Sequence, residues 1–160
     1  MRRVVVTGMG IVSPLGLGLE HNWSASTQGK SGLRKIRSFN ASDLPSQVPL
    51  STEVENPAGG LDINKYIEHK EQKKMDRFIH FGLVAGVDAV EDSGWKPTDY
   101  EDQCRTGVLI GSGIGGLQNI QDTTILVQEK GPRRISPFFI PSSLINLISG
   151  HVSIRYGFKG

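Results

Sequence analysis

A glycine-rich loop is the part of the sequence whose residue types and spacing point most directly to chemistry. A short apolar run, 106–110, leads into Gly111, Gly113, Gly115 and Gly116. Because glycine has no Cβ, the backbone there can lie directly against a ligand or another chain. We therefore expect close binding at this loop.

The same glycines satisfy the spacing G-x-G-x-x-G, which is typical of dinucleotide-binding folds. In those folds a second strand ends in Asp or Glu about 20 residues further on, where the acid binds the ribose. That position falls here in 133–141, a stretch with prolines and no acid. A nucleotide-binding domain therefore stays only a distant alternative.

Metal and thiol chemistry have little support in the sequence. Its four histidines show no H-x-x-x-H spacing, and one cysteine cannot build a structural zinc site, so we expect no metal. Cys104 lies in a charged connection without a strand-to-helix nucleophile turn, and we expect an incidental surface thiol. We expect His151 to be a packing histidine. The other histidines are His21, His69 and His80.

The elements that must position these residues alternate between strands and helices. Consecutive valines predict a buried strand over 2–7, and 106–110 reads as a second inner strand. Glycine turns between such elements favour a mostly parallel sheet with helices on both faces. Helices are predicted over 19–28, docked by Leu19 and Trp23, and over 75–93, 117–130 and 141–156.

Three lysines, Lys70, Lys73 and Lys74, crowd the predicted first turn of the central helix. The positive end of the helix dipole disfavours cations there by about 0.3–1 kcal/mol each at low salt. From composition alone, a solvated helix end softened by Glu71 and Asp76 is the favoured interpretation.

Composition excludes several classes of protein. A length of 160 residues suits one domain with its own core, and a net charge of +2 is too small to indicate nucleic acid binding. No apolar run approaches the roughly 20 residues of a membrane span, and the N-terminus does not resemble a signal peptide. One cysteine fits a reducing, cytoplasmic setting. Residues 30–61 are predicted to be a surface loop insert.

Several stretches taken together resemble a known family. They are the opening 3–16, the segments 70–76 and 86–94, the glycine loop, 137–141 and 146–151. In this order they are similar to the N-terminal part of the 3-oxoacyl-[acyl-carrier-protein] synthases, the thiolase-like condensing enzymes of type II fatty acid synthesis. The resemblance covers essentially all of residues 1–160. It implies a thiolase-like fold of two related α/β halves, of which this chain is most of the first.

The resemblance also implies an activity and its partners. Such an enzyme elongates acyl chains on acyl carrier protein by decarboxylative Claisen condensation with malonyl carrier. It needs no cofactor of its own, because the phosphopantetheine arm belongs to the carrier protein. A cytoplasmic homodimer is expected, with neither nucleic acid nor membrane as a partner.

Individual residues receive roles from the same resemblance. Ile114 matches an isoleucine that gates the acyl pocket, and Phe139 matches an aromatic that reaches this pocket from the partner subunit. Phe138 is expected to stay in its own core. The lysines 70, 73 and 74 and the pair Arg133 and Arg134 match part of the carrier docking patch, which reverses the solvated-helix interpretation.

No catalytic residue is assigned within the chain. The nucleophilic cysteine and two histidines of the family are expected at positions beyond Gly160, so the chain is interpreted as an N-terminal portion that is inactive alone. The main alternative is a catalytically silent chain-length partner of a polyketide-type synthase, which shares the scaffold and lacks the cysteine.

Overall fold

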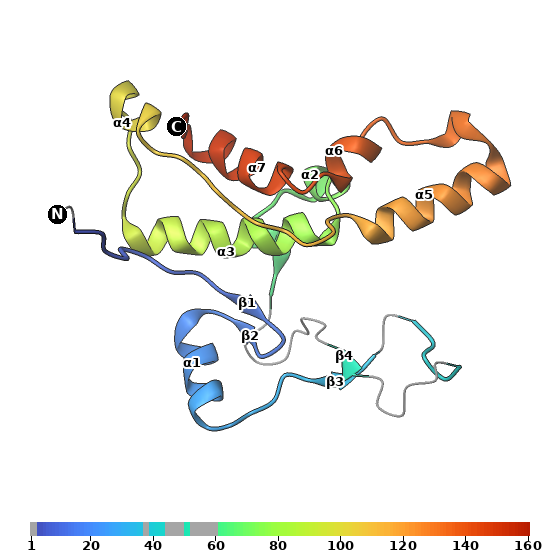
Figure 1. Ribbon diagram of the computed structural model, residues 1–160, viewed down its shortest axis with the longest axis horizontal. Helices are drawn as coiled ribbons and strands as arrows, with labels where there is room; N and C mark the ends of the chain where they lie inside the picture. The colour runs from blue at the N-terminus through green and yellow to red at the C-terminus, as the bar shows by residue number, and fades with distance from the viewer. Residues whose placement is uncertain (1–2, 37–38, 44–49, 52–60) are drawn as a thin grey trace.

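The computed structural model describes residues 3–36, 39–43, 50–51 and 61–160, and helices dominate it (Figure 1). The helices are α1 (Leu19–Thr27), α2 (His69–Gln72), α3 (Arg77–Ser93), α4 (Tyr100–Cys104), α5 (Leu117–Lys130), α6 (Phe139–Ser143) and α7 (Leu147–Tyr156), with 3-10 turns η1 (Ile63–Lys65) and η2 (Pro132–Arg134). The strands are β1 (Val12–Ser13), β2 (Gly16–Leu17), β3 (Arg34–Lys35) and β4 (Leu50–Ser51). They form two antiparallel pairs, β1 with β2 and β3 with β4.

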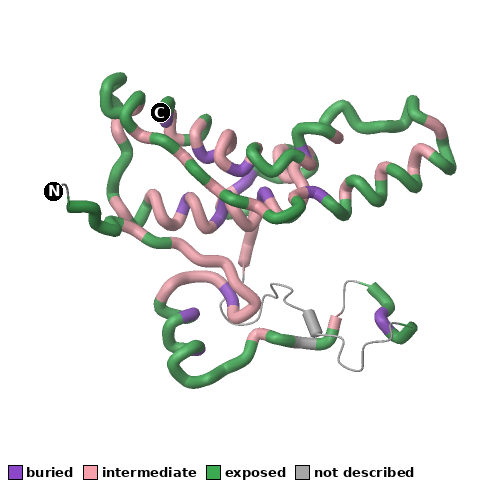
Figure 2. Tube along the Cα trace, viewed as in Figure 1, coloured by how far each residue is buried: buried purple, intermediate pink, exposed green. Residues whose placement is uncertain are grey.

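Helix α3 is the centre of the packed part, as its apolar pattern predicts. The side chain of Asp76 caps its N-terminus by accepting from the backbone N–H of Arg77, and Gly94 ends it in the left-handed conformation. Its buried residues are Ile79, Leu83, Val84 and Val87. They recur at helical spacing, so one face of α3 is removed from water (Figure 2).

Helix α7 covers part of this face. Ile148 and Val152 pack with Ile79 and Leu83 of α3 in one buried cluster, which Ile67 completes. Full burial of such a side chain is worth about 1.5–3 kcal/mol. The pairing of α3 with α7 is therefore worth several kcal/mol, at about 1.5–3 kcal/mol for each buried side chain.

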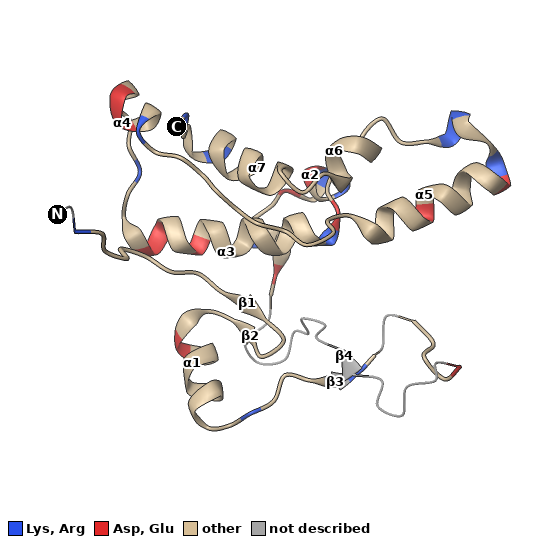
Figure 3. Cartoon of the chain, in the orientation of Figure 1, with Lys and Arg blue, Asp and Glu red and all other residues tan. Residues whose placement is uncertain are grey.

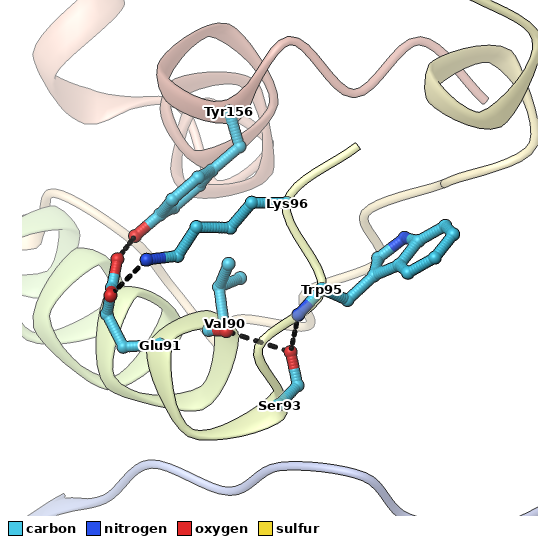
Figure 4. Close-up of polar contacts among 6 residues, drawn as sticks. All are labelled: Val90, Glu91, Ser93, Trp95, Lys96 and Tyr156. Atoms are coloured by element: carbon cyan, nitrogen blue, oxygen red, sulfur yellow. Dashed lines mark hydrogen bonds and ion pairs between the residues drawn. The ribbon is translucent and has the colours of Figure 1, made fainter. Parts of the chain in front are cut away.

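Polar contacts also tie α7 to the end of α3 (Figure 4). Tyr156 donates its hydroxyl to Glu91 Oε1 at 3.1 Å, and the Lys96 ammonium pairs with Glu91 Oε2. The hydrogen bond from Lys96 is the main cause that lowers the pKa of Glu91. Burial is the main cause that raises the pKa of Tyr156, followed by its hydrogen bond to Glu91. One exposed carboxylate thus joins the last turn of α7 to both α3 and the segment after it.

The N-terminal segment crosses the opposite side of α3 before it turns into β1. A Cβ on Gly10 would overlap the backbone of Ala85 and Ala89, so glycine is needed for this approach. The backbone N–H of Met9 donates to Asp92 Oδ2 at 2.9 Å. These contacts hold the β1–β2 hairpin and α1 below the helical layer (Figure 1).

Helix α1 matches its prediction, but the residue that docks it differs. Trp23 is exposed and Asn22 is buried, because Asn22 Nδ2 donates to the carbonyls of Gly16 and Gly18 at 3.1 and 2.8 Å. Carbonyls in a tight hairpin need donors, and this amide supplies them.

The two predicted inner strands do not form ladders in the described residues. Segments 3–7 and 106–110 are extended but unassigned to any sheet, and Val4 and Leu109 are 93% and 100% exposed. Valine-rich sequence favours a strand, yet a strand needs a neighbouring strand to pair its N–H and C=O groups. The described strands are short antiparallel pairs, so the predicted parallel sheet is not formed among them.

Two other segments differ from their predictions. The helix predicted over 141–156 is split into α6 and α7, because Leu144 is extended and the hydroxyls of Ser142 and Ser143 bond back to the Phe139 carbonyl. The predicted insert, 30–61, lies partly outside the described residues. Its described part contains β3 and β4, paired with Arg34 opposite Ser51.

The lysines do not lie in the first turn of the central helix. Lys70 belongs to the short helix α2, and Lys73 and Lys74 lie in the turn that follows it. A separate helix begins after Asp76, whose side chain caps α3 and whose backbone N–H donates to the Ser142 carbonyl at 3.3 Å. The dipole of α3 therefore does not act on these lysines in the way predicted.

Candidate functional site

Three segments meet at the N-terminal end of α3: the cap of α3, the glycine loop that leads into α5, and helix α6. The place where they meet is called the glycine-loop junction below. It consists of Asp76, Gly115, Gly116, Asn119, Ser142 and Ser143.

The glycines of the junction allow a close backbone contact with α6. Gly115 has a φ of +81°, and a Cβ there would lie 2.8 Å from the Ser143 carbonyl oxygen. A Cβ on Gly116 would lie 2.7 Å from Ser143 Cα, while the Gly116 N–H donates to the same carbonyl at 3.1 Å. The close approach predicted for the loop is therefore made at these two positions by the chain itself, whereas Gly111 and Gly113 face open space.

Side chains complete the junction. Asn119 Nδ2 donates to Ser142 Oγ at 2.6 Å and to Ser143 Oγ at 2.9 Å. The Asn119 backbone N–H donates to Asp76 Oδ2 at 3.2 Å. The first turn of α5 is thus bonded to both α3 and α6.

The two predicted acyl-pocket residues flank the junction. Ile114 directly precedes Gly115 and is 68% exposed, so its side chain does not plug the described core. Phe139 is half-buried, and its carbonyl accepts from the hydroxyls of Ser142 and Ser143 at 2.9 and 2.8 Å.

Phe138 differs from its prediction as a core residue. It is 42% exposed, and the Lys74 ammonium lies 5.3 Å from the centre of its ring. A cation over an aromatic face is attracted to it, so the ring is held at the surface beside the lysines.

The predicted docking cations lie in two groups (Figure 3). Lys70 and Lys73 are exposed near α2, where Lys74 also forms an ion pair with Glu71 at 2.5 Å. Arg133 and Arg134 are exposed in η2, at the outer turn between α5 and α6 and away from α2 (Figures 1 and 3). The cations therefore do not form one compact cluster.

A small open pocket of about 240 Å³ lies between Lys73 and the glycine-loop junction. Its lining includes Lys73, Asp76, Asn119 and Ser142. The charged surface and the polar junction are therefore adjacent.

The remaining candidates are unlike catalytic groups. Cys104 is exposed in α4, as predicted for a surface thiol. Burial lowers the pKa of His151 and of His80, which favours neutral packing histidines. In the described part of the chain no group of three or more His, Cys, Asp or Glu could hold a metal ion, and no helix is long and apolar enough to cross a membrane.

Asn119 and the serine pair were missed by reasoning from the sequence. No spacing rule marks an asparagine in a helix together with two serines more than twenty residues later. The only signal is that the two serines at 142 and 143 interrupt an apolar stretch. Only the fold brings them together.

Comparison with known proteins identifies the family. The model described as "Beta-ketoacyl synthase, N-terminal domain" matches residues 1–160, so the chain belongs to this family. It is 48% identical over 161 residues to the 3-oxoacyl-[acyl-carrier-protein] synthase 2 of Rhizobium meliloti (strain 1021), and 39% identical over 173 residues to the mitochondrial 3-oxoacyl-[acyl-carrier-protein] synthase of Arabidopsis thaliana. These matches cover 100% and 99% of this chain but 38% and 37% of the relatives.

Solved structures confirm the thiolase-like ketosynthase fold. The chain superposes with a TM-score of 0.71 and 25% identity on a chain of the structure described as "type II PKS acyl-carrier protein in complex with its ketosynthase bound to the hexaketide". The match covers 99% of this chain and 40% of the other. The ishigamide ketosynthase/chain length factor gives a TM-score of 0.75 at 24% identity, covering 97% and 37%. The superposition covers 99% of the chain, although the segments at 3–7 and 106–110 belong to no sheet among the described residues.

Proposed function

We propose that this chain forms the N-terminal part of an acyltransferase that elongates acyl chains on acyl carrier protein by decarboxylative condensation with malonyl carrier, as in fatty acid biosynthesis. The observation that carries the proposal is 48% identity over the whole chain to a 3-oxoacyl-[acyl-carrier-protein] synthase 2. Because the chain spans 38% of that relative, the activity is proposed for a protein that also contains the remaining portion.

The proposed reaction transfers the acyl group to a cysteine outside this chain and releases the carrier thiol. Loss of CO₂ from malonyl carrier leaves a carbanion, which attacks the acyl thioester; the cysteine thiolate leaves and takes up a proton. The chain itself contributes the wall and gate of the acyl pocket, through Ile114 and, from the partner in a homodimer, Phe139. A role as the gate of the pocket explains why Ile114 is exposed at the edge of the hydrogen-bonded glycine-loop junction.

Carrier docking is proposed for the basic residues, namely Lys70, Lys73, Lys74, Arg133 and Arg134. The exposure of Lys70, Lys73, Arg133 and Arg134 supports this role, because charges at a surface act mainly on encounter and orientation. A solved relative of the fold is a ketosynthase in complex with an acyl-carrier protein, which is consistent with such a partner. A cytoplasmic location and the absence of a bound cofactor are further parts of the proposal.

An assay with a purified protein of the relatives' length that carries this segment tests the function. We expect 3-oxoacyl carrier and CO₂ only when both acyl carrier and malonyl carrier are present. The same protein with Cys104→Ser should remain active, and the 160-residue chain alone should form no product.

The outcomes separate the alternatives. A well-folded protein that forms no product, yet changes the product length of an active synthase, would replace the proposal with a silent chain-length partner. Saturable binding of NAD(P)H or ATP without condensation would favour a nucleotide-binding domain.

A further inference from the structure

The amide of Asn119 is part of a hydrogen-bond chain with a fixed direction. The hydroxyls of Ser142 and Ser143 both donate to the Phe139 carbonyl, at 2.9 and 2.8 Å. Each hydroxyl has one proton, so its lone pairs remain to accept from Asn119 Nδ2. The order of donation therefore runs from Asn119 through the serines to the backbone of Phe139.

Backbone bonds close this chain into a ring of contacts. The Asn119 N–H donates to Asp76 Oδ2 at 3.2 Å, and the Asp76 N–H donates to the Ser142 carbonyl at 3.3 Å. Ser142 is buried, so loss of a partner there leaves a polar group that water does not readily reach. Three elements are thereby fixed relative to one another.

The ring holds two residues that the proposed function assigns to acyl pockets, Ile114 to the pocket of its own subunit and Phe139 to the pocket of the partner subunit. Ile114 is attached through Gly115 and Gly116, whose backbone has no room for a Cβ against Ser143. Phe139 is attached through its own carbonyl. Neither residue can shift relative to the other without breaking contacts of the junction.

We propose that Asn119 is a positioning residue that sets acyl-chain-length selectivity by holding the Ile114 loop against the segment that carries Phe139. This inference rests on the proposed function, because it assumes that Ile114 gates the acyl pocket of its own subunit and that Phe139 enters the pocket of the partner subunit. Asn119 does not touch the reacting atoms in this proposal. It acts through the position of Ile114.

The test measures kcat/KM against primer length in the longer protein, at equal folded fraction and well below the thermal midpoint of the least stable variant. In Asn119→Ala the ratio of kcat/KM between the best and the worst primer should fall about tenfold, since a hydrogen bond to a buried group is lost. Asn119→Asp, which replaces the donor amide with an acceptor, should narrow it similarly. Gln121→Ala, an exposed amide two residues further along α5, is the matched control and should keep the parental profile.

A double variant shows whether Asn119 acts through the gate. Ile114→Gly should itself change the length profile, and Asn119→Ala added to it should change the profile little further. Independent, additive effects would overturn the positioning role. If Asn119→Ala does not fold, Ser143→Ala removes one acceptor of the same amide and should narrow the ratio to a smaller extent; an unchanged profile there overturns the inference.

The two levels of the argument fail differently. An unchanged profile in folded Asn119→Ala, with a changed one in Ile114→Gly, overturns the inference and leaves the pocket assignment standing. An unchanged profile in Ile114→Gly removes the pocket assignment and the inference together. Absence of condensation in the parent protein removes the proposed function as well.

Discussion

The glycine-loop junction and the extended segments at 3–7 and 106–110 differ in how far the chain packs and hydrogen-bonds its own residues. At the junction the side-chain bonds of Asn119 span 2.6–3.5 Å and join α5 to α6, and its backbone N–H binds Asp76 at the cap of α3. Along the extended segments Val4 and Leu109 stand almost wholly in solvent. The difference follows from the backbone: a helix satisfies its own N–H and C=O groups, whereas a strand depends on a neighbour.

The largest expected effect compares a core residue with an exposed one. Ile79, which is 0% exposed, should cost about 2–5 kcal/mol of unfolding free energy when replaced by Ala, because a cavity is left between α3 and α7. Leu109→Ala in the same 160-residue chain should change stability by less than about 0.5 kcal/mol. Chemical denaturation followed by circular dichroism measures both.

Equal costs for the two substitutions would break the comparison. They would mean that the Leu109 side chain, which unlike Val108 and Ile110 is exposed in the structure, is packed in solution, either within the chain or by self-association. Sedimentation at several concentrations would identify self-association, which large exposed apolar patches favour.

A second prediction compares two helix caps. Asp76 caps α3 and also accepts from Asn119, whereas Asp99 caps α4 by accepting from Glu101 and Asp102 alone. Asp99→Ala should cost about 1 kcal/mol. Asp76→Ala should cost roughly 1 kcal/mol more, because it also removes the bond to α5. A cost for Asp76→Ala no larger than that for Asp99→Ala would show that the junction contributes nothing beyond a cap.

How far the sequence predicts this molecule depends on the kind of element. Helix α5 and the end of α3 were predicted to the residue, because apolar spacing and the glycines at 94 and 131 are local signals. The strand at 2–7 was also predicted from a local pattern. The formation of a strand depends on partner strands, however, and these are not marked by any local signal. In the site, Ile114 and Phe139 came from family resemblance, and Asn119 escaped because its partners lie 23 and 24 residues away.

A third prediction concerns the charged surface at Lys73 and Lys74, where reversal of the charge tests carrier docking. In the longer protein, Lys73→Glu with Lys74→Glu should raise KM for carrier-linked substrates by several-fold at low salt and spare small thioester analogues. The difference from wild type should shrink as salt screens the charges. Lys30→Glu with Lys35→Glu, which makes the same change in charge at one residue after α1 and one residue in β3, is the control. A similar rise in the control would point to net charge rather than docking.

The smallest expected effect is a pH dependence that acts on the helical part alone. Burial lowers the pKa of His80, whose Nε2 contacts the Gln72 carbonyl at 3.1 Å. The folded state therefore binds fewer protons than the unfolded state just below the ordinary histidine pKa of about 6.5. Stability should be fully present above that value and fall as pH drops through 6.5 toward the lowered pKa.

His80→Gln should reduce this loss between pH 7.5 and 5.5, because glutamine does not titrate. Amide exchange in α2 and α3 measures the effect locally, and segment 3–7, which contains no histidine, is the internal reference. The burial of His151 acts in the same direction, so part of the loss should remain in the single variant. An undiminished loss in His80→Gln would assign the effect to other groups.

The pairing of α3 with α7 has a consequence for the order of events during synthesis. Ile148 packs on α3 beside Gly82, which precedes it by 66 residues. A ribosome adding about 5–20 residues per second needs roughly 3–13 s to cover that distance. Throughout this interval the apolar face around Ile79 and Leu83 has left the ribosome without α7 to cover it. Nascent α3 should therefore depend on a chaperone during this interval.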